Sequence, residues 1–201
     1  MMTFACLVSG RGTNLQTILN VIKKGKLKTR CAVVLSDNEK ALALKRAVKA
    51  GVKAVYINPK DFRTRALFDR AILDYLKAER VDFVVLAGFM RVLSPAFVRA
   101  YRNKILNIHP ALLPNFRGAH AIRDAFKSGV DTTGVTVHFV DEKVDHGPII
   151  LQEKVKISPK DTLASLEAKI HKVEHKLYPK AIDLFVKKKL KIAGRKVRIK
   201  K

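Results

Sequence analysis

The sequence predicts an α/β protein with a doubly wound, mostly parallel sheet and an antiparallel C-terminal extension. Over the first 130 residues, short β-branched runs alternate with segments of helical periodicity, as in strand-helix-strand units. After residue 131, two adjacent strand-like runs precede one long helical segment. With 201 residues and 48% hydrophobic content, the chain can bury a sizeable core. We therefore expect a single domain over residues 1–201.

The first half of the chain is expected to contain five strands and three helices. Apolar, β-branched runs predict strands at Phe4–Val8, Cys31–Leu35, Lys53–Ile57, Val81–Ala87 and Ile105–Ile108. The first helix is predicted by apolar residues three and four apart, at Leu15, Ile18, Leu19 and Ile22. Two more helices are expected at Glu39–Ala50, which Gly51 would end, and at Phe62–Ala78.

The C-terminal part is expected to begin with two antiparallel strands. One is predicted by Val135, Val137 and Phe139, which alternate with Thr136, His138 and Val140, and the other by the run Ile149–Ile157. A long helix should then start at Asp161 and bury a stripe of apolar residues, Leu163, Leu166, Ile170, Val173 and Leu177. Pro179 is expected to bend or end this helix, and a basic tail should follow from about residue 187.

The net charge is unusually high: 41 Lys and Arg against 17 Asp and Glu give +24. Such a chain attracts any polyanion, including nucleic acid, phosphates and polyglutamylated folates. The tail carries no aromatic residue among its basic ones to stack a base, and no nucleic-acid motif occurs, so a solvated basic surface is favoured over dedicated nucleic-acid binding.

Other composition features concern the compartment. The longest apolar stretch, Phe83–Met90, is too short for a bilayer-spanning helix, and the N-terminus lacks the pattern of a secretory signal. A cytoplasmic protein without membrane contact is expected. Cys6 and Cys31 lie in strand-like runs, which indicates small core side chains rather than a disulfide or a nucleophile.

A glycine-rich loop, Gly10-Arg11-Gly12-Thr13-Asn14, follows the first predicted strand and opens the first helix. Backbone amides and the helix dipole favour an anion there, with phosphate the natural ligand. The dinucleotide-binding fingerprint needs a third Gly at the position where this chain has Leu15. A nicotinamide cofactor is therefore disfavoured, although Asp37 provides an acidic residue at the end of the second predicted strand, as such cofactors require. A tight turn that needs glycine for backbone reasons alone is the simpler alternative.

The segment His171-Lys172-Val173-Glu174-His175 fits the H-x-x-E-H pattern of an inverted zinc protease. A third ligand, usually an acid further along the chain, could not come after Asp183, because no acidic residue follows it. Polar residues on an exposed helix face explain the pattern better than zinc does.

Two further segments contain side chains that can act as catalytic groups: Asn107-Ile108-His109-Pro110 and Asp145-His146-Gly147-Pro148. Proline restricts the backbone of His109 to extended or turn geometry, which holds the ring in place. A lone histidine at a strand end is more often a buried, hydrogen-bonded core residue, and an Asp before Gly-Pro is common in turns. The two segments therefore indicate a site only in combination.

Together with Ser9–Asn14 and Leu86-Ala87-Gly88-Phe89-Met90-Arg91, these segments closely resemble the folate-dependent phosphoribosylglycinamide formyltransferases of purine biosynthesis. The resemblance extends from Phe4 to about Lys191. It implies a formyltransferase-like Rossmann-type fold. It also implies transfer of a formyl group from 10-formyltetrahydrofolate, as co-substrate, to the amine of 5'-phosphoribosylglycinamide, without a metal.

The resemblance also implies roles for individual residues. Formyl transfer needs stabilisation of an oxyanion and movement of a proton, for which Asn107 and His109 supply N–H groups and Asp145 a carboxylate. The acceptor substrate would be bound by Gly12, Thr13, Asn14, His171 and Glu174. Folate would contact Arg65, Met90, Arg91, Val92, Leu93 and Asn107. Four more residues lie in matching segments and would shape the site: Ser9, Gly118, Thr136 and His138.

Departures from the family pattern are few: Arg117 stands where Pro is frequent, His146 is bulky for its turn, and the tail is more basic. Methionyl-tRNA formyltransferase and formyltetrahydrofolate hydrolase share the central segments but carry an additional domain for which 201 residues leave no room. The alternatives are a formyltransferase for another phosphorylated or sugar amine and a basic nucleic-acid-binding protein. We expect small-molecule substrates, no specific nucleic acid, and a monomer or homodimer.

Overall fold

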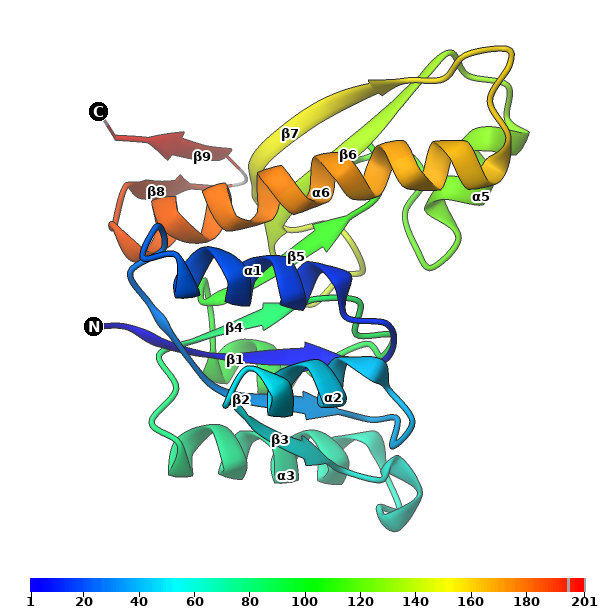
Figure 1. Cartoon of the computed structure of the whole chain (residues 1–201). Coiled ribbons are helices and arrows are strands. Elements are labelled where there is room, and N and C mark those ends of the chain that lie inside the picture. Colours follow the sequence, from blue (N-terminus) through cyan, green and yellow to red (C-terminus); the bar gives the residue numbers. More distant parts are fainter. Residues whose placement is uncertain (195, 201) are drawn as a thin grey trace. The chain divides into compact units, whose positions relative to one another are not determined.

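The computed structural model describes residues 1–194 and 196–200. By its internal contacts the chain divides into two compact units, Met1–Leu106 and Asn107–Lys201. Both combine helices with strands (Figure 1), which confirms the predicted α/β class. The expectation of one domain over the whole chain stays a prediction. Arg195 and Lys201, two residues of the predicted basic tail, lie outside the described residues.

The first unit contains four parallel strands in the order β3-β2-β1-β4. The strands are β1 (Thr3–Val8), β2 (Arg30–Ser36), β3 (Lys53–Tyr56) and β4 (Phe83–Leu86). The helices are α1 (Thr13–Lys23), α2 (Leu42–Lys49), α3 (Arg65–Ala78) and α4 (Pro95–Ala100), and a short 3-10 turn, η1, spans Pro59–Asp61. Parallel strands joined by helices confirm the doubly wound arrangement.

β1 is the centre of this unit. Its residues Phe4 to Val8 are completely buried, and it pairs with β2 on one side and with β4 on the other. The strand order therefore reverses at β1, and the loops after β1 and β4 leave the same edge of the sheet. Ser9 Oγ accepts a hydrogen bond from the Met90 amide at 2.9 Å, which ties these two loops together. Ligands of open α/β sheets bind at such a reversal point.

Two helices start later than predicted. Asn38 turns the chain by accepting from the Lys40 amide and donating to the Ser9 carbonyl, so α2 begins at Leu42 instead of residue 39. Thr64 caps α3 through the Leu67 amide, and Phe62 before it is extended. The short helix α4, which begins with a Ser94 cap and Pro95, was not predicted.

The second unit contains β5 (Ile105–His109), which carries the chain into it, and four further strands. These are β6 (Thr132–Phe139), β7 (Ile149–Lys156), β8 (Leu190–Ala193) and β9 (Lys196–Ile199). As predicted, β6 and β7 are antiparallel. Helix α6 (Leu163–Val186) packs against both of them, and α5 (Ala121–Lys127) lies beside α6 (Figure 1). Two described parts of the segment predicted as a basic tail, β8 and β9, pair antiparallel, and we call this pair the β8–β9 hairpin.

One expectation for the second unit needs correction. Pro179 does not end α6, which continues to Val186, so only a bend at this residue stays a prediction. A proline inside a helix costs about 3 kcal/mol, and burial of neighbours such as Tyr178 and Ile182 offsets this cost. In β6 the alternating polar residues Thr136 and His138 are buried as well, so the strand is covered on both faces.

The cysteines occupy core positions, as predicted. Cys6 and Cys31 are buried, unpaired thiols, and burial raises the pKa of Cys31 to about 12. Within the described residues, no helix has both the length and the hydropathy needed to cross a membrane.

Candidate active site

The candidate catalytic residues gather around the end of β5 in the second unit. Asn107 and His109 are two residues apart on this strand and therefore project to the same side of it. Asp145 comes from the loop between β6 and β7, and His138 from the end of β6. The structure thus brings together the Asn, the His and the Asp that the sequence indicated.

The Asp145 carboxylate is the hub of this cluster. Oδ2 accepts from the Gly118 amide at 2.9 Å and lies 3.3 Å from His109 Nδ1. Oδ1 accepts from Asn107 Nδ2 at 3.4 Å. Burial raises the pKa of Asp145, but the facing His138 ring and the Gly118 amide lower it more, so the net shift is downward. Asp145 is therefore a carboxylate at neutral pH.

The His109 ring is almost inaccessible, with 3% of the residue exposed. Its Nε2 lies 2.7 Å from the Phe116 carbonyl oxygen. Because a carbonyl can only accept, Nε2 carries a proton. Burial lowers the pKa of His109, and the opposing influences of Asp145 and the Phe116 carbonyl do not cancel this effect. The imidazolium form is therefore disfavoured, although both ring nitrogens face oxygen acceptors, Nε2 the Phe116 carbonyl and Nδ1 the Asp145 carboxylate.

Asn107 and His138 fix each other's orientation. His138 Nδ1 lies 2.7 Å from the Phe139 carbonyl, and because a carbonyl only accepts, this nitrogen donates. His138 Nε2 then accepts from Asn107 Nδ2 at 3.2 Å. The Asn107 amide consequently turns its NH₂ group, a donor, toward the cluster.

A hydrogen-bonded brace holds the chain that follows His109. Thr136 Oγ1 on β6 donates to the Ala111 carbonyl at 2.6 Å and accepts from the Leu113 amide at 3.1 Å. Gln152 on β7 donates through Nε2 to both Thr136 Oγ1 and the Leu113 carbonyl, each at 2.9 Å. These bonds fix the segment that leads from His109 to the Phe116 carbonyl.

Another part of the second unit, α6, carries His171 and Glu174. Glu174 is buried, and its Oε2 accepts from His171 Nδ1 at 2.8 Å. The rings of His171 and His175 are stacked with centroids 6.4 Å apart. Among residues 1–194 and 196–200, no three His, Cys, Asp or Glu side chains gather in the way a metal site requires.

The glycine-rich loop lies in the first unit and leads directly into α1. Gly12 caps the helix with φ of 72°, a left-handed conformation that favours glycine. A Cβ atom at Gly12 would lie 2.6 Å from the Ala43 Cβ, so α2 packs too closely for any side chain there. The first turn of α1, which starts at Thr13 and Asn14, contains no acidic residue. This end of α1 suits an anion.

The predicted folate-binding segment Met90–Leu93 follows β4 in the same unit. Arg91 stacks over the Phe68 ring at 5.2 Å and lies 3.9 Å from Asp37. Met90 and Val92 are exposed, whereas Leu93 is buried. Arg65 is an exposed residue at the start of α3.

Comparison with known proteins adds to this geometry. A family model described as formyl transferase matches residues 2–182. The chain belongs to the formyl transferase family. The segments at the ends of β1, β4 and β5 that contain the candidate site residues all lie within the matched residues.

Individual relatives within this family are similar over most of the chain. It is 40% identical over 182 residues to a phosphoribosylglycinamide formyltransferase of Bacillus subtilis (strain 168), covering 90% of this chain and 93% of that protein. It is 45% identical over 184 residues to the trifunctional purine biosynthetic protein adenosine-3 of Drosophila melanogaster, covering 90% of this chain. The chain spans only 14% of the length of the Drosophila protein.

Among solved structures, glycinamide ribonucleotide transformylase 1 from Symbiobacterium toebii matches with a TM-score of 0.98 and 46% identity. The match covers all of this chain and 95% of that one. A phosphoribosylglycinamide formyltransferase from Bacillus halodurans matches with a TM-score of 0.90 and 40% identity, over 92% of this chain and 96% of that one. These neighbours confirm the formyltransferase-like fold expected from the sequence.

Sequence reasoning missed three contributors to the site. The Phe116 carbonyl that faces His109 and the Gln152 side chain that braces the loop depend on the folded chain, and no local pattern marks them. Asp69 on α3 accepts from the Ser94 amide and fixes the end of the Met90–Leu93 segment. An acidic residue within the apolar stripe of α3 could have indicated that Asp69 has a buried partner.

Proposed function

We propose that this chain transfers a formyl group from 10-formyltetrahydrofolate to the amine of 5'-phosphoribosylglycinamide in de novo purine biosynthesis. Membership of the formyl transferase family and the names of its relatives support this reaction. The observation that carries the proposal is the buried cluster in which Asp145 contacts both Asn107 and His109.

The cluster has the groups that formyl transfer needs. Attack of an amine on the formyl carbon creates an oxyanion, which N–H donors stabilise. Asn107 offers its NH₂ group, and His109 offers the Nε2 proton that now faces the Phe116 carbonyl. The reacting oxygen would replace that carbonyl as the acceptor for His109. Asp145 would orient His109 and receive, directly or through a water, the proton released by the attacking amine. As the intermediate collapses, the bond between the formyl carbon and the folate nitrogen breaks and this proton passes to the leaving nitrogen.

The acceptor substrate would be recognised at two places. Gly12, Thr13 and Asn14 would bind its phosphate with backbone amides at the start of α1. Glu174 would accept hydrogen bonds from the ribose hydroxyls, with His171 beside it.

The folate co-substrate would lie against the segment after β4. Met90, Val92 and Leu93 would supply apolar and backbone contacts to the flat pterin, and Arg91 and Arg65 positive charge near its carboxylates. Asn107 would contact the formyl end. The exposed apolar side chains of Met90 and Val92 suit this role, because a bound ring would cover them.

No residue in this scheme needs a metal, and the substrates are small molecules. We expect no specific nucleic-acid binding and a monomer or homodimer. A gel-shift series at rising salt checks the former: binding to nucleic acid should weaken steeply. Tight, sequence-selective binding at physiological salt would contradict it.

One assay tests the reaction itself. Folate product formation is followed with purified protein and 10-formyltetrahydrofolate, with and without 5'-phosphoribosylglycinamide. Product should form only with the acceptor, and the Asp145→Asn variant should form almost none. Equal product formation without acceptor would indicate hydrolysis of the donor. A better rate with another sugar amine would support a formyltransferase of different acceptor specificity.

A further inference from the structure

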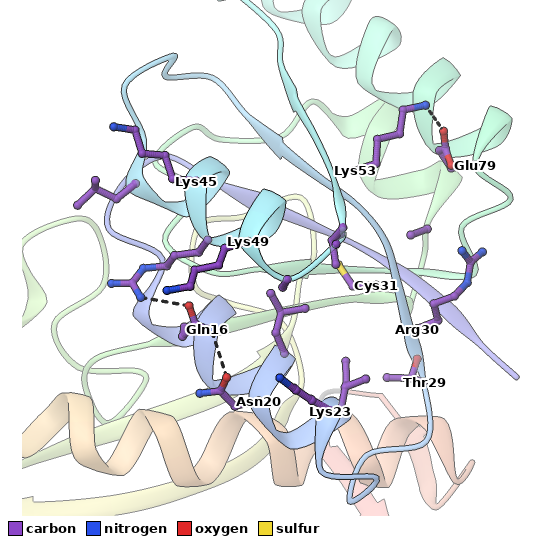
Figure 2. Close-up of a pocket in the computed structure, with 18 of the residues that line it drawn as sticks. Gln16, Asn20, Lys23, Thr29, Arg30, Cys31, Lys45, Lys49, Lys53 and Glu79 are labelled. Carbon is purple, nitrogen blue, oxygen red and sulfur yellow. Dashed lines mark hydrogen bonds and ion pairs between the residues drawn. The ribbon is translucent and has the colours of Figure 1, made fainter.

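A concave surface of the first unit lies between α1 and α2. It encloses about 1230 Å³ and is lined on the α1 side by Gln16, Asn20 and Lys23 and on the α2 side by Lys45, Arg46 and Lys49. We call it the α1–α2 groove. Its described lining includes no residue of the loops 9–14 and 86–93, which belong to the candidate active site. The groove is therefore a separate feature of this unit (Figure 2).

The groove is strongly basic. Besides the four cations of α1 and α2, Arg30 and Lys53 also line it, and the one acidic lining residue, Glu79, is ion-paired with Lys53. Arg46 donates hydrogen bonds to the Arg11 carbonyl and to the Gln16 side chain. The remaining four cations, Lys23, Arg30, Lys45 and Lys49, form no ion pair with any residue that the structure describes.

A chain of side-chain hydrogen bonds turns donors toward this groove. Arg46 donates through Nη1 to Gln16 Oε1 at 3.2 Å, so the Gln16 amide must present its NH₂ to the other side. Gln16 Nε2 then donates to Asn20 Oδ1 at 3.0 Å. Both amide oxygens are occupied, and the NH₂ group of Asn20 is left as a donor for a ligand. Figure 2 shows Lys23 and Lys49 extending to the same side as this pair.

Helix stability alone explains only part of this charge. Lys23 and Lys49 lie in the last turns of α1 and α2, where a cation interacts favourably with the helix dipole. Lys45 lies in the middle of α2 and Arg30 at the start of β2, so interaction with the C-terminal end of a helix dipole does not explain their charge. Like charges around a concave surface repel each other, and together they concentrate anions from solution.

The size, charge and lining of the groove define the class of ligand. A single phosphate would fill a small part of 1230 Å³ and meet few of the cations. No Phe, Tyr or Trp occurs among the described lining residues, so stacking of successive bases, as in single-stranded nucleic acid, has no platform. Lysine binds phosphate as a point charge, and four uncommitted cations match the charge of about −4 on a triphosphate chain.

We propose that the α1–α2 groove is a second anion site of this protein that binds an oligophosphate chain, carried by inorganic triphosphate or by a nucleoside triphosphate. Apolar residues such as Leu19, Cys31 and Val52 also line the groove and would contact the nucleoside in the second case. This site is independent of the proposed formyl transfer, so either can fail without the other.

Calorimetric titration of the full chain tests the proposal, with magnesium-free inorganic triphosphate as the probe at an ionic strength of about 0.15 M. The Lys45→Gln/Lys49→Gln variant should bind at least about tenfold more weakly, because two charged contacts are lost. The matched control, Lys60→Gln/Lys77→Gln, removes the same charge from two exposed lysines of the first unit outside the groove. It should change the affinity less than about twofold.

Adenosine triphosphate as a second probe distinguishes the two possible carriers of the phosphate chain, inorganic triphosphate and a nucleoside triphosphate. Tighter binding than inorganic triphosphate assigns the site to a nucleoside triphosphate, and equal binding assigns it to the phosphate chain alone. The proposal is overturned if no saturable binding occurs, or if both variants lose affinity equally, which would indicate general charge attraction. It is also overturned if single-stranded RNA binds the groove in preference to both probes.

Discussion

Replacement of Asp145 by asparagine tests the centre of the candidate site while disturbing its packing least. An asparagine oxygen in the place of Oδ2 can still accept from the Gly118 amide, now 2.9 Å away. Its NH₂ group then takes the place of Oδ1 and faces the Asn107 NH₂ group, which keeps its bond to His138 Nε2. We therefore expect the variant to fold, with a loss of stability of no more than about 1 to 2 kcal/mol.

The catalytic loss should be far larger than the loss of stability. Asp145→Asn removes the negative charge 3.3 Å from His109 Nδ1 and the acceptor of Asn107 Nδ2. In a serine protease the corresponding loss of a buried aspartate beside a catalytic histidine lowers kcat by about 10⁴. Here we expect kcat to fall by about 10² to 10⁴, equivalent to about 2.7 to 5.5 kcal/mol of barrier. The KM for the formyl donor should change little.

The pH profile gives an independent check. His109 has a pKa below its ordinary value of 6.5 because it is buried, and the Asp145 carboxylate counteracts part of this shift. Without the carboxylate the pKa falls further, so the acid limb of the kcat profile should move to lower pH in the variant. In the unfolded chain His109 binds protons more readily, so it destabilises the folded state as the pH falls below 6.5 toward its lowered pKa.

The assay is steady-state product formation from pH 5 to 9 with both substrates saturating, alongside thermal unfolding of the same preparations. His146→Asn is a suitable control, because His146 follows Asp145 in the same loop and its Nδ1 pairs with Asp141. The reasoning is refuted if folded Asp145→Asn keeps more than about a tenth of the wild-type kcat, since less than about 1.4 kcal/mol would then depend on the charge. A shift of the acid limb to higher pH would refute it as well.

Four further outcomes are expected. Glu174→Ala should raise the KM for phosphoribosylglycinamide by an amount equivalent to about 1.5 to 3 kcal/mol of binding free energy and leave the folate KM unchanged. An unaltered acceptor KM would rule out ribose recognition by this residue. Gln152→Ala should lower kcat and the thermal midpoint together through loosening of the brace, whereas a fall in the midpoint alone would limit Gln152 to a structural role. Gly12→Ala should destabilise the protein by about 1 to 3 kcal/mol in denaturant titrations because its Cβ meets Ala43, and unchanged stability would contradict that contact. Activity should survive exhaustive chelation, and stoichiometric zinc with chelator-sensitive activity would overturn the metal-free scheme.

Hydrophobic periodicity in the sequence predicted those helices and strands that bury a single face or are buried throughout. The helix with Leu15 and Ile18 and the strand β1 were predicted almost to their ends, because the helix buries a single face and the strand is completely buried from Phe4 to Val8. The start of α2 was missed because Asn38 forms side-chain bonds that favour a turn over a helix. The continuation through Pro179 could not be predicted, since it depends on tertiary burial around that residue.

The candidate site was predictable to the extent that its residues are close in sequence. The spacing of Asn107 and His109 places both on one side of a strand, but Asp145 was recognised only through the family resemblance. Its approach to His109 requires the turn between β6 and β7, where Asp145 itself has φ of 47°. The acceptor of the His109 proton, a backbone carbonyl of Phe116, has no side-chain identity that a sequence could reveal.

The β8–β9 hairpin has a consequence for how copies of this protein behave at high concentration. β8 is the last strand of its sheet, and an edge strand can recruit a strand from another molecule. Lys191 on β8 lies opposite Arg198 on the neighbouring strand β9, and both residues are exposed. An incoming copy would bring the same positive charges to the same edge. Repulsion between identical lysine-bearing strands therefore opposes self-assembly, and part of the +24 charge acts as protection against aggregation.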